Sequence, residues 1–345
     1  MLKNKVIETI KKYRQIETGD SLIIGVSGGP DSICLLHILS DIWGQSPNSQ
    51  KGKRGLSPFS QNSILGTDLY VAHVNHMIRK EADAETEYVE EFCKRLGIKC
   101  FTKKVDVKKV AKNEKISEEE AGRKVRYEFF DEVMNITKSN KIATAHNAND
   151  NVETVLMNII RGTGLSGLKG ITPTRDKYIR PLIEITREEI EEYCEKNNLE
   201  PKYDETNKEN IYTRNKIRNE LIPYIKKEYN PNIVATLNRL SELALGECEY
   251  LEDVVRYMYE EVLIEKVDEV ITLNLTKFNK LELIIKRRLI LYVIKELLGE
   301  AKDIGKIHID DIIKLCNNNI GNKFLIPNKK VKILVKSGKV FYCKN

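Results

Sequence analysis

Apolar residues in the first two thirds of the chain fall into short runs that are separated by amphipathic stretches. Four short runs predict strands, at 22–26, 69–74, 98–105 and 141–145. Segments with apolar residues three and four positions apart lie around them and predict helices, for example at 3–16, 82–96 and 117–131. Strands that alternate with helices predict an α/β fold with a doubly wound, mainly parallel sheet, similar to a Rossmann fold.

The pattern changes close to residue 223. Long helical segments follow at 233–265 and 281–298, and an alternating segment at 323–342 predicts two or three short strands. We therefore predict three parts, a catalytic α/β domain at 1–222, a smaller all-helical domain at 223–300 and a short basic β-rich segment at 301–345. Residues 44–66 are rich in Ser, Gln, Asn, Gly and Pro and are predicted to be a flexible insertion, whose contact with RNA is left open.

Composition changes this picture only a little. A chain of 345 residues is expected to form two or three domains, and its net charge of +6 argues only weakly for a polyanionic partner. Seven cysteines without any C-x-x-C favour reduced thiols over a zinc or iron-sulfur site. We find no apolar leader and no membrane-spanning run, so we expect a cytoplasmic protein without a membrane partner. The oligomeric state is left open, with a homodimer as one option.

The segment 27–32, Ser-Gly-Gly-Pro-Asp-Ser, follows the first apolar run directly. Two glycines let backbone N–H groups approach an anion, and a proline at the first helical position starts a helix whose N-terminus favours negative charge. An acid among phosphates requires a cation, so we assign Mg²⁺ to Asp31. The alternative is an ordinary glycine-rich turn. The candidate phosphate-binding residues are Ser27, Gly28, Gly29, Pro30, Asp31 and Ser32.

Two more polar clusters fall where predicted strands end. His73 and Asn75 end the second strand, where ligands of parallel sheets gather, although a structural role is the alternative. His146, Asp150 and Glu153 follow the fourth strand and can project from the first turns of one helix. A histidine with two carboxylates is suited to orient an amine and remove its proton. A pair on a helix surface is the alternative there.

Basic residues recur at helical spacing. Arg123 and Arg126 share a face of the helix that Ser117 caps, and they can reach phosphates or a carboxylate unless they are ordinary surface ion pairs. Arg214 and Arg218 lie one turn apart and are the strongest local candidates for contact with a polyanion.

Seven motifs, taken in order, resemble one family. The loop resembles that of the N-type ATP pyrophosphatases, or PP-loop enzymes, and the whole series resembles the tRNA(Ile)-lysidine synthetase family. The family pattern is S-G-G-x-D-S, H-V-N-H-x-x-R, E-A-x-R-x-x-R-Y, A-H-x-x-x-D-x-x-E-T, R-G-x-G-x-x-G-L-x-G, R-P-L and R-N-x-I-R. Matching residues lie here at 27–32, 73–79, 120–127, 145–154, 161–170, 180–182 and 214–218.

The resemblance implies a ligase that modifies isoleucine tRNA with a CAU anticodon. ATP would adenylate the C2 oxygen of the wobble cytidine, and L-lysine would then displace AMP to give lysidine. Implied catalytic residues are Asp31, Arg123, Arg126, His146 and Asp150. ATP would also contact His73 and Asn75, and lysine would contact His146, Asp150 and Glu153. Implied tRNA contacts are Arg79, Arg161, Arg214 and Arg218, with the helical domain adding more.

The sequence departs from the family pattern in two places. The family commonly has a second His and a second Asp where this chain has Asn147 and Asn149, so we assign no chemistry to these two residues. We also expect the chain to end before or early in a further C-terminal domain that many members carry. Alternatives with the same fold are a tRNA thiolation enzyme, which would need paired cysteines, and an NAD or GMP synthetase. A catalytically silent RNA-binding module would leave Asp31, His146 and Asp150 without a purpose.

Overall fold

The computed structural model describes residues 2–43, 68–77, 82–202, 213–301, 303–318 and 323–345. The chain forms two compact units, Met1–Glu242 and Leu243–Asn345. The predicted insertion at 44–66 and the candidate tRNA contact Arg79 lie outside the described residues.

The first unit contains a six-stranded sheet with the order β3-β2-β1-β4-β6-β5. Its strands are β1 (Leu22–Gly25), β2 (Leu69–Asn75), β3 (Lys99–Lys104), β4 (Lys141–Ala143), β5 (Thr174–Arg175) and β6 (Tyr178–Ile179). Neighbouring strands pair in parallel, except for the antiparallel pair β5 and β6. In the register, Leu22 of β1 lies opposite Leu69 on one side and Lys141 on the other.

Helices connect these strands. They are α1 (Leu2–Lys12), α2 (Pro30–Trp43), α3 (Ala82–Leu96), α4 (Val107–Glu114), α5 (Glu118–Thr137), α6 (Ala148–Ile160), α7 (Leu165–Leu168), α8 (Arg187–Lys196), α9 (Thr213–Lys216), the π-helical turn η3 (Ile217–Leu221) and α10 (Ile222–Glu228). The start of α5 is capped as predicted, because the Ser117 hydroxyl accepts a hydrogen bond from the Glu120 N–H at 3.1 Å.

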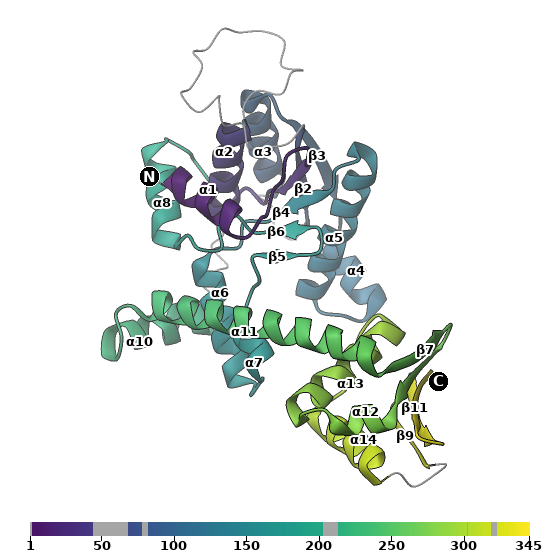
Figure 1. Ribbon diagram of the computed structural model, residues 1–345. Helices are drawn as coiled ribbons and strands as arrows, with labels where there is room; N and C mark the ends of the chain where they lie inside the picture. The colour runs from purple at the N-terminus through teal and green to yellow at the C-terminus, as the bar shows by residue number, and fades with distance from the viewer. Residues whose placement is uncertain (1, 44–67, 78–81, 203–212, 302, 319–322) are drawn as a thin grey trace. The chain divides into compact units, whose positions relative to one another are not determined.

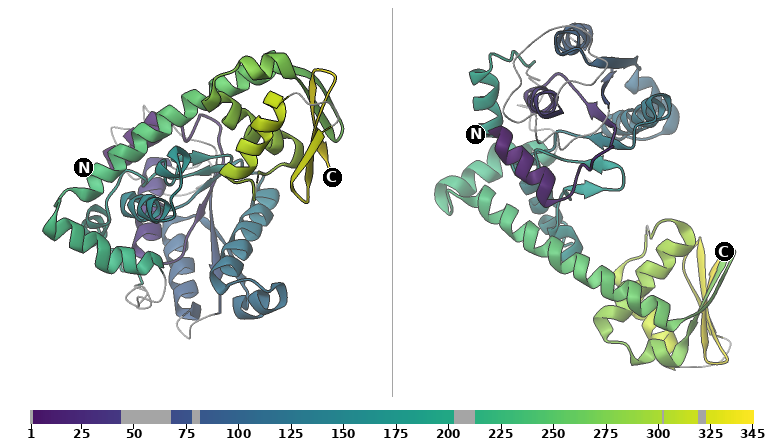
Figure 2. Two further views of the ribbon diagram at one scale, coloured as in Figure 1. Left: turned by 90° about the horizontal axis from the view of Figure 1, so that it is seen from below. Right: turned by 45° about the horizontal axis from the view of Figure 1, so that its top comes forward.

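Both faces of the sheet are covered, which explains why β1 is apolar at successive positions. Leu22 and Ile24 belong to a core that includes buried residues of α1, α2, α3 and α8. Ile23, between them, is buried with Phe129 and Phe130 of α5. Figure 1 and Figure 2 show α2 and α3 on one side of the strands and α5 on the other. The prediction of a doubly wound, mainly parallel α/β sheet is confirmed.

The second unit is built on a five-stranded antiparallel sheet with the order β7-β8-β11-β10-β9. Its strands are β7 (Leu263–Val267), β8 (Val270–Asn274), β9 (Lys323–Asn328), β10 (Val331–Lys336) and β11 (Lys339–Lys344). The helices are α12 (Leu275–Lys280), α13 (Leu283–Leu298) and α14 (Lys306–Asn318). Buried strand residues such as Leu273 and Tyr342 share a core with Phe278 of α12 and Leu289 of α13. No helix within the described ranges combines the length and apolarity needed to cross a membrane.

Two features of this region differ from the sequence prediction. The hairpin β7–β8 was missed, because β7 exposes most of its residues and therefore lacks an inward-facing alternation. The compact units divide at Glu242, whereas the sequence predicted a boundary at residue 222. The reason is that α11 (Ile233–Val262) starts in the first unit, where Val234 and Leu237 pack with Val152 and Val155 of α6.

Candidate functional site

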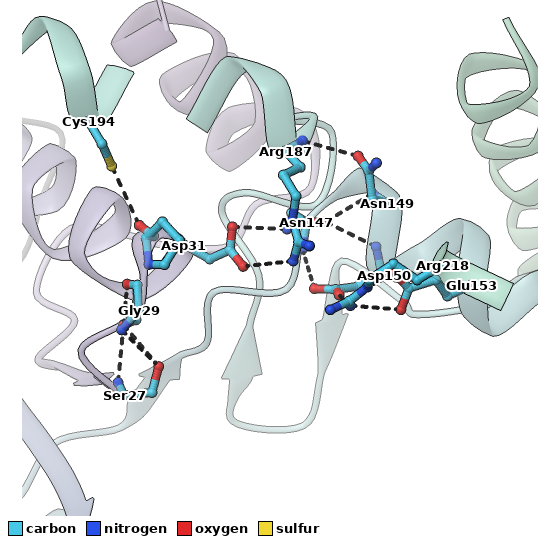
Figure 3. A network of polar contacts seen from close by, with 12 residues as sticks. Ser27, Gly29, Asp31, Asn147, Asn149, Asp150, Glu153, Arg187, Cys194 and Arg218 are labelled. Carbon is cyan, nitrogen blue, oxygen red and sulfur yellow. Dashed lines mark hydrogen bonds and ion pairs between the residues drawn. The ribbon is translucent and has the colours of Figure 1, made fainter. Parts of the chain in front are cut away.

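The carboxyl ends of β1 and β4 lie side by side where the strand order reverses. The chain continues from β1 to β2 and β3 on one side, whereas β4 and β6 lie on the other side. Loops that leave two such strands diverge, and ligands of open parallel sheets bind between them. Both α2 and α6 begin here, so two helix N-termini, which favour negative charge, converge on one place (Figure 3).

The loop after β1 is folded around the hydroxyl of Ser32. Its Oγ accepts hydrogen bonds from the backbone N–H groups of Ser27 at 3.1 Å and Gly28 at 3.2 Å, and it donates to the carbonyl of Gly29 at 3.0 Å. Gly28 has a φ of +91°, and Pro30 is the first residue of α2. These residues therefore form one turn that is held together by the Ser32 hydroxyl, and their contact with phosphate stays a prediction.

The two glycines of this loop provide a matched pair of substitutions. We expect Gly28→Ala to lower the unfolding free energy by about 1–2 kcal/mol, because a side chain is strained at its positive φ. Gly29 has no positive φ, and an added Cβ would lie 3.6 Å from the Ser27 Oγ, an ordinary contact. Gly29→Ala should keep stability and weaken ATP binding by obstructing the loop. Urea unfolding and ATP titration test this, and an equal loss of stability in both variants would contradict it.

Asp31, at the start of α2, faces the N-terminus of α6 (Figure 3). Its Oδ1 accepts a hydrogen bond from Asn147 Nδ2 at 3.1 Å, and its Oδ2 lies 3.7 Å from Arg187 Nη2. Burial raises the pKa of Asp31 to about 6, and the charge of Asp150 also raises it, whereas Arg187 lowers it. A buried carboxylate beside a second one favours a bound cation.

This carboxylate fits the predicted Mg²⁺. Among the described residues, no group of three or more His, Cys, Asp and Glu side chains is arranged to hold a metal ion. Mg²⁺ that accompanies a nucleotide does not need such a cage, because it is typically held by one or two carboxylates and by the phosphates. Asp31 supplies one carboxylate at the end of the phosphate-binding loop.

Asn147 connects the two helix N-termini, although the sequence had given it no role. It caps α6 by accepting hydrogen bonds from the N–H groups of Asn149 and Asp150, and Asp150 Oδ2 accepts one from the Asn147 N–H in return. Its side-chain amide donates to Asp31 at the same time. Asn147 is fully buried and thereby fixes Asp31 relative to Asp150. A capping pattern was readable in the sequence, but its bond to Asp31 was not.

Asp150 and Glu153, which we call the carboxylate pair, are both bound by Arg218 (Figure 3). Arg218 Nε donates to Glu153 Oε1 at 2.5 Å, and Nη2 donates to Glu153 Oε2 at 2.9 Å and to Asp150 Oδ1 at 3.1 Å. Arg214 Nε lies 3.6 Å from Glu153 Oε2. Burial raises the pKa of Glu153, and the bonds from Arg218 lower it. Residues predicted to bind lysine and residues predicted to bind RNA thus contact one another.

His146 lies just before α6. Its Nδ1 is 3.0 Å from the hydroxyl of Thr144. Burial lowers the pKa of His146 to about 4; the charge of Asp150 raises it, and the charges of Arg180 and Arg126 lower it. The imidazole is therefore neutral near pH 7, where it can position a substrate by hydrogen bonding but is a weak base for an ammonium group.

Arg123 and Arg126 share the exposed side of α5, as predicted. The guanidinium of Arg123 lies 5.0 Å from the centre of the Tyr127 ring and donates a hydrogen bond to its hydroxyl at 3.2 Å. Because the charge of Arg126 lowers the pKa of His146, the helix brings this arginine near the predicted amine site. Their catalytic role stays a prediction.

His73 and Asn75 are buried, and their side chains bind other parts of the protein. His73 Nδ1 lies 2.9 Å from the carbonyl of Val26, and Asn75 Nδ2 donates to the Ala82 carbonyl at 3.0 Å. These bonds hold the end of β2 to β1 and to α3. Their contact with ATP stays a prediction. The hydrogen bonds within the protein are enough to explain why a histidine and an asparagine stand at these positions. Arg161 is exposed at the C-terminal cap of α6.

Arg187 was not among the predicted site residues. It opens α8, its backbone N–H donates to Asn149 Oδ1 at 3.1 Å, and its guanidinium faces Asp31. Its buried Nε has no hydrogen-bond partner among the described residues. The residue lies 156 positions after Asp31, so neither spacing nor periodicity could have placed the two together.

Comparison with known proteins identifies the family of this fold. The sequence profile of the PP-loop domain matches residues 2–225. A solved structure, the U34-tRNA thiolase NcsA from Methanococcus maripaludis with its [4Fe-4S] cluster, superposes with a TM-score of 0.55 at 19% identity, covering 71% of this chain and 80% of that one. This likeness shows the fold alone. Fold and site together define a PP-loop protein.

Sequence relatives that match nearly the whole chain identify the family within the PP-loop class. The tRNA(Ile)-lysidine synthases of Clostridium perfringens and Clostridium acetobutylicum are 43% and 45% identical over 95% and 94% of this chain. That of Clostridioides difficile is 40% identical over 99% of this chain and 70% of its own length. The chain belongs to the tRNA(Ile)-lysidine synthase family. It spans just under two thirds, 66%, of the length of the two Clostridium relatives.

Proposed function

We propose that the protein is an ATP-dependent ligase that joins L-lysine to C2 of the wobble cytidine in isoleucine tRNA with a CAU anticodon. The products are lysidine, AMP and pyrophosphate, and the modified tRNA reads AUA instead of AUG and accepts isoleucine instead of methionine. These substrates place the enzyme in the cytoplasm. The observation that carries the proposal is the double contact of Asn147, which holds Asp31 and the helix turn with Asp150 in one frame.

Two half-reactions fit this arrangement of Asp31, Asn147 and Asp150. In the first, the C2 oxygen of the cytidine attacks the α-phosphorus of ATP, the bond to the β-phosphate oxygen breaks, and pyrophosphate leaves. In the second, the uncharged ε-amine of lysine attacks C2, the C–O bond breaks, and AMP leaves with the electron pair. The amine loses its protons to the carboxylate pair or to water. Asp31 thus serves the first half-reaction, and the carboxylate pair serves the second.

We propose a role for each of these residues from its position. The N-terminus of α2, at the end of the 27–32 loop, binds phosphate oxygens, and Asp31 would hold Mg²⁺, which when bound neutralises charge on the phosphates. Asp150 and Glu153 bind the lysine ammonium, and neutral His146 orients the amine. Arg126 or Arg123 neutralises the phosphate charge of the departing AMP.

We further propose that Arg187, whose guanidinium lies beside Asp31, binds the phosphates of ATP. Its unpaired Nε and its 3.7 Å distance from Asp31 support this role. Arg187→Gln is expected to raise the KM for ATP by about tenfold and to leave the KM for lysine unchanged, since a charge-assisted bond is worth roughly 1.5–3 kcal/mol. Lys196→Gln, in an exposed ion pair on the same helix, is the matched control. An unchanged KM for ATP would remove Arg187 from the phosphate site.

The proposal is tested with purified protein, ATP, labelled lysine and a CAU-anticodon transcript. We expect lysine incorporation that requires ATP and releases one pyrophosphate for each lysine. A transcript with uridine at the wobble position, and ornithine in place of lysine, are the controls. Correctly folded protein that incorporates no lysine would overturn the proposal, and sulfur transfer to the transcript would favour the thiolation alternative.

A further inference from the structure

Arg218, a predicted tRNA contact, donates hydrogen bonds to both members of the carboxylate pair. Three bonds of 2.5 to 3.1 Å join its guanidinium to both carboxylates, with Glu153 bound in a bidentate manner. The side chain of Glu153 is 1% exposed and that of Arg218 is 19% exposed, so the contact is largely shielded from water. The two carboxylates thus already bind a cation, the Arg218 guanidinium, through charged hydrogen bonds.

The backbone that carries Arg218 differs from an ordinary helix. Arg218 belongs to η3, the π-helical turn between α9 and α10. π-helical turns inside helices occur frequently at functional sites, because the inserted residue re-aims neighbouring side chains. Ile217, 3% exposed, anchors this turn against Val152 and Val155 of α6, and α6 is the helix that carries the carboxylate pair. The turn can therefore hold its backbone position while the Arg218 side chain changes partner.

We infer that Arg218 occupies the place of the lysine ε-ammonium, so that lysine and Arg218 compete for Asp150 and Glu153. This inference rests on the proposed function, which makes these carboxylates the lysine site. A lysine ammonium and an arginine guanidinium are both donors of charged hydrogen bonds, and two such cations cannot fill one pair of carboxylates. Arg218 is thus a positioning residue that closes the site until it is drawn away.

A phosphate anion is the partner that draws Arg218 away. Guanidinium groups bind phosphate in the same bidentate manner as carboxylate, so the exchange conserves the hydrogen bonds of Arg218. The phosphate can come from the RNA backbone or from the nucleotide. Either source makes lysine bind after the polyanion, so that free lysine does not occupy the site before a cytidine is ready for it.

The experiment measures lysine binding by calorimetry to the full chain without RNA or ATP. Arg218→Gln is expected to bind lysine at least about tenfold more tightly than the wild type, because a close charged competitor is gone. Arg218→Lys should show a smaller gain, since an ammonium cannot make the bidentate contact. Lys226→Gln, which removes an exposed positive charge from α10, is the matched control and should bind lysine like the wild type.

Separate additions identify the source of the phosphate. The affinity of the wild type for lysine should rise when the transcript is added, or when a non-hydrolysable ATP analogue with Mg²⁺ is added. The addition that raises the affinity identifies the source of the phosphate. Arg218→Gln should show little further rise with either one. A gain in affinity separates this role from a merely structural one, which would lower the affinity.

Each outcome decides the inference. A folded Arg218→Gln protein that binds lysine as the wild type does, or more weakly, overturns it; if that variant does not fold, unchanged affinity in Arg218→Lys overturns it. If the wild type makes lysidine while the Arg218 variants show no gain in lysine affinity, the inference about Arg218 is wrong and the proposed function stands. If the wild type makes no lysidine and binds no lysine even with RNA present, the proposed function fails.

Discussion

Asp31→Asn is expected to slow pyrophosphate release from ATP strongly while leaving the fold intact. Asparagine has the size of aspartate and keeps an oxygen for the Asn147 amide, but it cannot neutralise a cation on the phosphates. We expect the rate to fall by roughly 10²–10³-fold, the usual cost of losing one electrostatic contact to a developing charge. Pyrophosphate release in the presence of transcript is the measurement, and tRNA retention on a filter should be nearly unchanged.

The same substitution is expected to stabilise the ligand-free protein at alkaline pH. Burial raises the pKa of Asp31 to about 6, above the usual aspartate value of 3.8, so the folded state binds this proton more tightly than the unfolded state does. The wild type therefore gains stability from this group as the pH falls from 8 through 6. Asp31→Asn should lack that part of the pH dependence and be more stable at pH 8 by up to about 3 kcal/mol.

Denaturant unfolding at several pH values tests this pair of effects. Asp41→Asn is the matched control, because Asp41 lies at the other end of α2 in an exposed ion pair with Lys3. Binding of Mg²⁺ and ATP to the wild type should weaken as Asp31 gains its proton near pH 6. An Asp31→Asn protein that releases pyrophosphate at the wild-type rate would show that another group holds the cation.

Glu153→Gln is expected to separate the two half-reactions. Glutamine removes the charge that binds an ammonium, whereas the phosphate-binding loop and Asp31 are untouched. Lysine incorporation should fall by roughly 10²–10³-fold, while pyrophosphate is still released until the RNA is adenylated. The adenylated transcript should accumulate and be detectable by mass spectrometry.

This variant should also be less stable, because Arg218 and Arg214 lose their carboxylate partner. We expect a loss of about 2–3 kcal/mol of unfolding free energy, the cost of removing one partner of a shielded charged pair. Glu192→Gln, in an exposed pair on α8, is the control for the loss of one negative charge. Equal loss of pyrophosphate release and lysine incorporation would contradict a role for Glu153 in lysine binding alone.

Substitutions of the two partners of the Arg218–Glu153 ion pair are expected to change lysine binding in opposite directions. Glu153→Gln should weaken lysine binding, whereas Arg218→Gln should strengthen it, although both break the same ion pair. A purely structural ion pair would give losses in both variants. The comparison therefore distinguishes a site that is closed by its own arginine from a contact that only holds α6 to η3.

The amino-acid sequence by itself determined the α/β part and the contents of the phosphate loop, because these depend on neighbours along the chain. An apolar run followed by Ser-Gly-Gly-Pro-Asp-Ser predicts strand, turn and helix N-terminus through local backbone preferences. Helical spacing likewise predicted that Arg123 and Arg126 share a face. The motif series pointed to the family because each motif is also a pattern of neighbouring residues.

Only the tertiary structure decided which of these local pieces meet. Asn147 and Arg187 approach Asp31 from positions more than 110 residues away, and Arg218 binds carboxylates that lie 65 and 68 residues before it. The second sheet likewise brings β11, from the end of the chain, beside β8. Such contacts depend on the strand order and on the packing of whole helices, and no local pattern of charge or hydrophobicity encodes them.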